Sequence, residues 1–146
     1  MITVLIVEDN SEDAELLEMA WQRAGFQKKI NLVPDGQEAV DYLEGRGQYA
    51  DRSRFPFPQV VVSDLKMPRV NGLELLEWLR KDKRCSVLPA ILLSGAGLRE
   101  DVEAAYKLGA NTYFKKPATL AGLVELLKQL REYWMRSELP AVSGAN

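Results

Sequence analysis

The sequence contains no histidine and a single cysteine, Cys85. Without His, a metal site would rely on oxygen ligands, which select hard cations such as Mg²⁺ or Mn²⁺. The chain is also unable to carry a phosphohistidine of its own. One cysteine excludes an internal disulfide and is typical of proteins from a reducing compartment.

Long apolar runs and an excess of one charge are also missing. No apolar stretch approaches the roughly 18 residues of a membrane span, and the N-terminus lacks the basic segment of a signal peptide. The 19 basic and 21 acidic residues nearly balance, which gives no reason to expect nucleic acid as a partner. We therefore expect a cytoplasmic protein that binds neither membrane nor nucleic acid.

Short apolar segments alternate with amphipathic ones along the 146 residues. This alternation predicts an α/β fold with a doubly wound, five-stranded parallel sheet. We expect residues 1–136 to form one domain and residues 137–146 a flexible C-terminal tail. The expected strands are 3–7, 30–33, 60–63, 89–94 and 112–115, and the expected helices are 11–24, 36–43, 72–80, 99–108 and 119–135, the first of them with Ser11 as its N-cap.

Acidic residues follow two of these apolar segments directly. Glu8 and Asp9 come after the first strand, and Asp64 comes after the third. If the two strands are neighbours in a parallel sheet, the three carboxylates meet at its carboxyl edge, where open α/β sheets bind ligands. Their mutual repulsion requires raised pKa values or a bound cation. This cluster is the strongest functional signal in the chain.

Three further polar residues are expected at the same edge. Ser94 ends the fourth strand, Lys116 follows the fifth, and Lys66 lies two residues after Asp64. A cation, a hydroxyl and an ammonium beside an aspartate are suited to holding a phosphoryl group while the carboxylate attacks phosphorus.

Five motifs in order resemble the receiver domain of two-component response regulators, and the resemblance covers residues 1 to about 136. They are Val7-Glu8-Asp9-Asn10, Ser63-Asp64-Leu65-Lys66-Met67-Pro68, Gly72, Leu93-Ser94-Gly95 and Tyr113-Phe114-Lys115-Lys116-Pro117. The fold that this implies is the flavodoxin-like (βα)5 receiver fold. The long segment before the third strand and the absence of an output domain also resemble the stand-alone receivers paired with bacterial phytochrome histidine kinases.

The resemblance implies a role for each matching residue. Asp64 would be the phosphoacceptor, and Glu8, Asp9, Asp64 and the backbone carbonyl of Lys66 would hold Mg²⁺ or Mn²⁺. Lys116 and Ser94 would contact the phosphoryl group, and Tyr113 would turn inward behind Ser94 as a switch. The function implied is that of a single-domain response regulator, phosphorylated by a histidine kinase and signalling through a changed protein-binding surface. Apart from its own phosphorylation and slow dephosphorylation, such a domain is not an enzyme.

Details of the motifs add two expectations. The resemblance implies a cis peptide before Pro117. Glu8 stands where Asp is commoner in the family, and Lys66 and Ala96 occupy positions that tune the phosphoryl lifetime in relatives.

Alternative functions differ in the residues that they need. A phosphohydrolase using an aspartyl-phosphate needs a second acid two residues after the nucleophile, where this chain has Lys66. A flavodoxin-like cofactor binder needs a Gly-rich or hydroxyl-rich phosphate loop after the first strand, where Glu8 and Asp9 would repel phosphate. A phosphorelay intermediate, which passes the phosphoryl group to a histidine phosphotransfer protein, remains open.

Two surfaces are candidates for partners. The segment 45–58 carries three arginines and three aromatic residues, and we favour an interpretation in which its aromatics fold back onto the domain. The last helix is apolar beyond one face, because Val124, Leu126 and Tyr133 widen its core stripe. A homodimer through the fourth and fifth helices would cover that extra surface.

Overall fold

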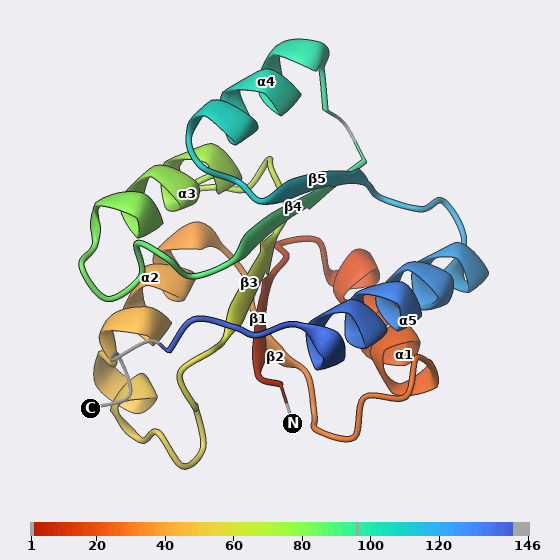
Figure 1. Ribbon diagram of the computed structural model, residues 1–146, viewed down its shortest axis with the longest axis horizontal. Coiled ribbons are helices and arrows are strands. Elements are labelled where there is room, and N and C mark those ends of the chain that lie inside the picture. Colours follow the sequence, from red (N-terminus) through yellow and green to blue (C-terminus); the bar gives the residue numbers. More distant parts are fainter. Residues whose placement is uncertain (1, 96, 142–146) are drawn as a thin grey trace.

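The computed structural model describes residues 2–95 and 97–141. Its centre is a five-stranded parallel sheet with the strand order β2-β1-β3-β4-β5 (Figure 1). This is the doubly wound α/β fold predicted from the sequence. The strands are β1 (Val4–Val7), β2 (Asn31–Val33), β3 (Val60–Ser63), β4 (Ala90–Ser94) and β5 (Thr112–Lys115), and the helices are α1 (Ser11–Arg23), α2 (Gly36–Glu44), α3 (Gly72–Lys81), α4 (Arg99–Lys107) and α5 (Leu120–Arg136).

Alternate residues of the central strands feed two separate hydrophobic cores. Val4 and Ile6 of β1 point to one face of the sheet, which α1 and α5 cover, whereas Leu5 and Val7 point to the other, which α2 and α3 cover. Both sides of β1, β3 and β4 are buried. The near-continuous apolar runs in the sequence are therefore those of strands covered on both faces.

Side-chain caps fix where the helices begin. The prediction that Ser11 caps α1 is wrong: Asn10 is the N-cap, with its Oδ1 accepting the Asp13 N–H at 2.9 Å, and Ser11 is the first helical residue. Asn10 wins because an Asn at this position has the extended backbone that an N-cap requires and an oxygen that reaches the third helical N–H. Asp35 caps α2 in the same way, accepting the Glu38 N–H at 2.8 Å.

The segment 45–58 folds back onto the domain, as favoured from the sequence. A short 3₁₀ helix (Gly47–Ala50) interrupts it, and Tyr49 and Phe57 are buried in the core on the α2 side. Arg52 donates to the carbonyls of Tyr42 and Leu43 at the end of α2. The segment is thus an ordered extension of α2.

No described peptide bond is cis, so the prediction of a cis bond before Pro117 is wrong. The trans form is the lower in energy for most X–Pro bonds. Among the described residues, no helix has the length and apolar character needed to cross a bilayer.

Candidate functional site

Three acidic side chains meet at the carboxyl edge of the sheet. β1 and β3 are neighbours in register, with Val7 opposite Ser63, so the residues after them emerge side by side. Glu8, Asp9 and Asp64 each offer an oxygen, and these oxygens all lie within 4.8 Å of one another. Three carboxylates at this spacing fit a single hard cation.

The three acids differ in their exposure to water. Glu8 is buried, Asp64 is half-buried, and Asp9 is exposed. Glu8 is held in place at both ends, because its N–H donates to the Val33 carbonyl at 3.0 Å and its Oε2 accepts the Asn10 N–H at 3.2 Å. A cation at this edge would therefore have one rigid, dry ligand and one ligand open to solvent.

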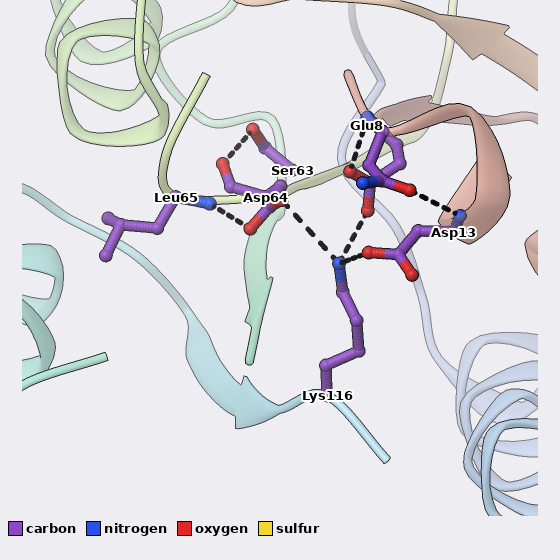
Figure 2. A network of polar contacts seen from close by, with 7 residues as sticks. Glu8, Asp13, Ser63, Asp64, Leu65 and Lys116 are labelled. Atoms are coloured by element: carbon purple, nitrogen blue, oxygen red, sulfur yellow. Dashed lines mark hydrogen bonds and ion pairs between the residues drawn. The ribbon is translucent and has the colours of Figure 1, made fainter. Parts of the chain in front are cut away.

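Lys116 reaches into the cluster from the end of β5 (Figure 2). Its Nζ lies 2.6 Å from Glu8 Oε1, 3.0 Å from Asp13 Oδ2 and 3.6 Å from Asp64 Oδ2. The first two contacts are hydrogen bonds, whereas the third is a longer ion pair. Residues 116 and 64 are thus brought together as the sequence predicted.

Asp13 is a site residue that the sequence reasoning missed. It lies in the first turn of α1, where acidic residues are common as helix-stabilising groups, so its position alone gave no reason to single it out. The contact with Lys116 joins residues 103 positions apart and depends on the Lys116 side chain reaching from the end of β5 to the first turn of α1. Only the three-dimensional structure brings these two residues together.

Burial and charge shift the pKa values of the central pair. Burial, reinforced by the charge of Asp64, raises the pKa of Glu8 to about 7 despite the opposing effect of Lys116. Burial also acts to lower the pKa of Lys116, but its hydrogen bonds to Glu8 and Asp13 raise that pKa above its ordinary value. Lys116 therefore stays positively charged, and a metal ion beside Glu8 would offset the cost of burying its carboxylate.

Asp64 is held by its own loop. Its Oδ1 accepts the Leu65 N–H at 2.7 Å, which leaves Oδ2 facing Lys116. The Gly72 N–H donates to the Leu65 carbonyl at 2.7 Å, and a Cβ on Gly72 would overlap the Asp64 carbonyl oxygen. Glycine at position 72 therefore lets α3 begin directly against the loop that carries the candidate nucleophile.

The same loop is tied to α2 by an ion pair. Arg69, which has a positive φ of 65°, places its guanidinium 2.7 Å from Asp35 Oδ2. Lys66 lies two residues after Asp64 with its side chain exposed. Ala96, the other variable position near the site, lies outside the described residues.

Ser94 is the last residue of β4, and Tyr113 is the second residue of β5. The Ser94 side chain is buried. The Tyr113 hydroxyl is covered, and it packs so closely on Gly97 that any side chain at position 97 would overlap it. Burial raises the pKa of Tyr113, and the nearby Ser94 partly offsets that rise. Tyr113 thus already points inward in this structure.

The parallel sheet and the acid cluster with its paired lysine define the class of the molecule, an α/β domain with an acidic carboxyl edge whose oxygens could hold a cation. The model of the response regulator receiver domain matches residues 4–128, so the chain belongs to the response regulator receiver family. The family and fold expected from the sequence are confirmed.

Three solved structures of response regulators are similar over nearly the whole chain. RPA3017, a response regulator in red light signaling of R. palustris, has a TM-score of 0.89 and 36% identity, covering 97% of this chain and 100% of its own. Phosphorylated RcpA, a cyanobacterial phytochrome response regulator, has a TM-score of 0.85 and 30% identity; the match covers 96% of this chain and 99% of RcpA. The Mn²⁺-bound form of Rcp1, from Synechocystis sp., has a TM-score of 0.82 and 25% identity; the match covers 97% of this chain and 100% of Rcp1.

Proposed function

We propose that this chain is a single-domain response regulator whose Asp64 accepts a phosphoryl group from a histidine kinase. The observation that carries the proposal is the placement of Asp64 within the cluster of acids, with its Oδ2 3.6 Å from Lys116. A nucleophilic carboxylate, a cation site and an ammonium are the parts that phosphoryl transfer to aspartate needs.

The proposed metal ligands are Glu8, Asp9, Asp64 and the backbone carbonyl of Lys66. Their oxygen-only chemistry fits Mg²⁺ or Mn²⁺, and Rcp1, a similar protein, has been solved in its Mn²⁺-bound form. A bound cation would neutralise negative charge on the acids and on the incoming phosphoryl group. This neutralisation matters most at Glu8, whose burial raises its pKa.

Each remaining residue has a proposed role in the transfer. An Asp64 carboxylate oxygen attacks phosphorus in line, a P–O bond forms, and the P–N bond to the kinase histidine breaks, with the imidazole leaving. Lys116 neutralises the phosphoryl oxygens, and the Ser94 hydroxyl donates a hydrogen bond to one of them. Tyr113 packs behind Ser94 and would transmit the change to the surface of α4 and β5.

The output is proposed to be protein binding. Phosphorylation adds about −1.5 to −2 charge at the site, which biases a two-state surface towards one arrangement. Exposed apolar side chains on and beside α4 and α5 offer such a surface, which we propose as a homodimer face; they are Leu98, Tyr106, Tyr133 and Met135.

The proposed partner is a histidine kinase of the phytochrome type, because the chain is similar to RcpA, a phytochrome response regulator. We propose that both proteins act in the cytoplasm. Onward transfer to a histidine phosphotransfer protein is the alternative. If an added histidine phosphotransfer protein removes the phosphoryl group from this chain within seconds, faster than spontaneous hydrolysis does, the relay would be favoured.

The proposal is tested by intact mass after incubation with acetyl phosphate and Mg²⁺. We expect one added phosphoryl group, which is absent in Asp64→Asn and in an EDTA control. Beryllofluoride, a phosphoryl analogue, separates a short-lived adduct from a site that takes no phosphoryl group. A folded protein that gains no adduct and binds no beryllofluoride would refute the proposed function.

A further inference from the structure

The Lys116 ammonium has three N–H donors, and two of them are engaged away from Asp64. They are directed to Glu8 at 2.6 Å and Asp13 at 3.0 Å, whereas Asp64 Oδ2 stands beyond hydrogen-bond distance at 3.6 Å (Figure 2). The resting lysine is therefore held on the α1 side of the site. A phosphoryl group on Asp64 would have to draw it away from one of these partners.

The Asp13 carboxylate does not make the capping hydrogen bond that is usual for an acid at its position in a helix. It is the third residue of α1, where a carboxylate commonly accepts the N-cap backbone N–H. Glu74 in α3 and Asp101 in α4 do so, each at 3.1 Å. In α1, however, the Asn10 N–H donates to Glu8 instead, which leaves the Asp13 carboxylate to Lys116.

A bound cation would not remove this contact. Among the described residues, the acids that can share one ion are Glu8, Asp9 and Asp64, and Asp13 is outside that group. A cation would weaken the hold of Glu8 on Lys116, because it neutralises the Glu8 carboxylate. The contact with Asp13 would persist after the metal binds.

We propose that Asp13 is a positioning residue that holds Lys116 away from Asp64 and competes with the phosphoryl group for it. This inference rests on the proposed phosphoacceptor function. Asp13 keeps the Asp64 carboxylate free to act as a nucleophile and metal ligand in the resting state. It also sets how strongly the phosphoryl group must attract Lys116 before the switch engages.

The test is the equilibrium affinity for beryllofluoride at saturating Mg²⁺, measured by titration calorimetry. Asp13→Asn should bind about threefold to tenfold more tightly than the natural chain, because Lys116 no longer has to leave a charged partner. Asp13→Glu keeps the charge and should stay near the natural affinity. Glu12→Gln removes the same charge from the same helical turn without a contact to Lys116 and should change the affinity less than about twofold.

A second readout needs no metal. In EDTA, Asp13→Asn should have a lower urea midpoint than the natural chain, while Glu12→Gln should not. A variant that is less stable yet binds beryllofluoride more tightly cannot be explained by general structural damage, which would weaken both.

Each outcome decides the inference. Unchanged or weaker binding by Asp13→Asn, or equal tightening by Glu12→Gln, would overturn it while leaving the phosphoacceptor function in place. A natural chain that folds but binds no beryllofluoride would instead refute the phosphoacceptor function, and this inference with it.

Discussion

At the scale of single residues, the site places one positively charged side chain, Lys116, among several carboxylates. Lys116 has carboxylates of Glu8, Asp13 and Asp64 within 4.0 Å, and Asp9 adds a fourth acid nearby. Burial, reinforced by the charge of Asp64, raises the pKa of Glu8 to about 7 even with Lys116 beside it. The negative charge that Lys116 leaves unbalanced is the basis on which we propose a divalent cation at this site.

The raised pKa of Glu8 predicts that metal affinity depends on pH. A proton on Glu8 must leave before the carboxylate can bind a metal ion, so protons and metal compete below about pH 7. We expect the Mg²⁺ affinity to fall as the pH is lowered from about 8 to about 5.5, approaching tenfold per pH unit at the acid end. Calorimetric titration across this range measures it.

Glu8→Gln provides the control for this prediction, because it cannot take up the proton. Its Mg²⁺ binding should be weaker at about pH 8 and should vary less with pH across the same range. An affinity in the natural chain that is flat down to about pH 5.5 would show that Glu8 is already ionised there.

Cys85 gives a second prediction at the residue scale. Its side chain is fully buried, and burial raises the pKa of its thiol to about 12. Because the thiolate is the reactive form, the folded protein should react with a thiol reagent at about pH 8 only at the rate of unfolding. Rapid modification of the native chain, comparable to that in urea, would contradict the burial of this residue.

At the scale of elements, the side chain of Arg80 connects segments that are distant in the sequence. Arg80 of α3 donates to the carbonyl of Gly109 at 2.8 and 3.0 Å and to that of Leu88 at 2.8 Å. One side chain thus connects the end of α3 with the turns that precede β4 and β5. The strands that position Ser94 and Lys116 begin at these turns.

Replacing Arg80 should therefore weaken the whole domain. In Arg80→Met the two carbonyls lose their charged donor, and we expect the free energy of unfolding in urea to fall by about 2–4 kcal/mol. Lys81→Met is the matched control, because Lys81 is exposed and its 3.5 Å pair with Glu77 is a surface contact. A loss below about 1 kcal/mol in Arg80→Met would contradict the structural role of Arg80.

The elements themselves could be predicted from the sequence because their signals are local. Apolar runs and helix caps placed every strand and α-helix to within about two residues but missed the 3₁₀ helix Gly47–Ala50, and strand adjacency then brought Glu8, Asp9, Asp64 and Lys116 together. The contact between Asp13 and Lys116 could not be predicted, because it depends on the packing of α1 rather than on a local pattern. The sequence could not show that Asn10 rather than Ser11 is the N-cap of α1, because both residue types are good N-caps.

At the scale of the whole molecule, the site and the proposed output surface occupy different parts of one small domain. Tyr113, the second residue of β5, packs its hydroxyl on Gly97, just before α4. Tyr106 of α4 accepts the Tyr113 backbone N–H at 3.2 Å. A change at Ser94 and Lys116 therefore has a short route to the surface of α4.

This arrangement predicts that phosphorylation changes self-association. Sedimentation should show a larger share of dimer with beryllofluoride and Mg²⁺ than without them. Tyr133→Lys should reduce that share, because Tyr133 is 67% exposed on α5 and a charge there opposes burial. Monomer alone in both states would refute the proposed homodimer face.

The most direct test of the central claim is the location of the phosphoryl group. Borohydride reduces an aspartyl-phosphate to homoserine, so peptide mass spectrometry after treatment with acetyl phosphate and Mg²⁺ marks the modified residue. The proposed mechanism predicts homoserine at position 64 and at no other acid, and none in Asp64→Asn. Homoserine at Asp9 or Asp13, or a phosphorylated natural chain with none at position 64, would contradict it.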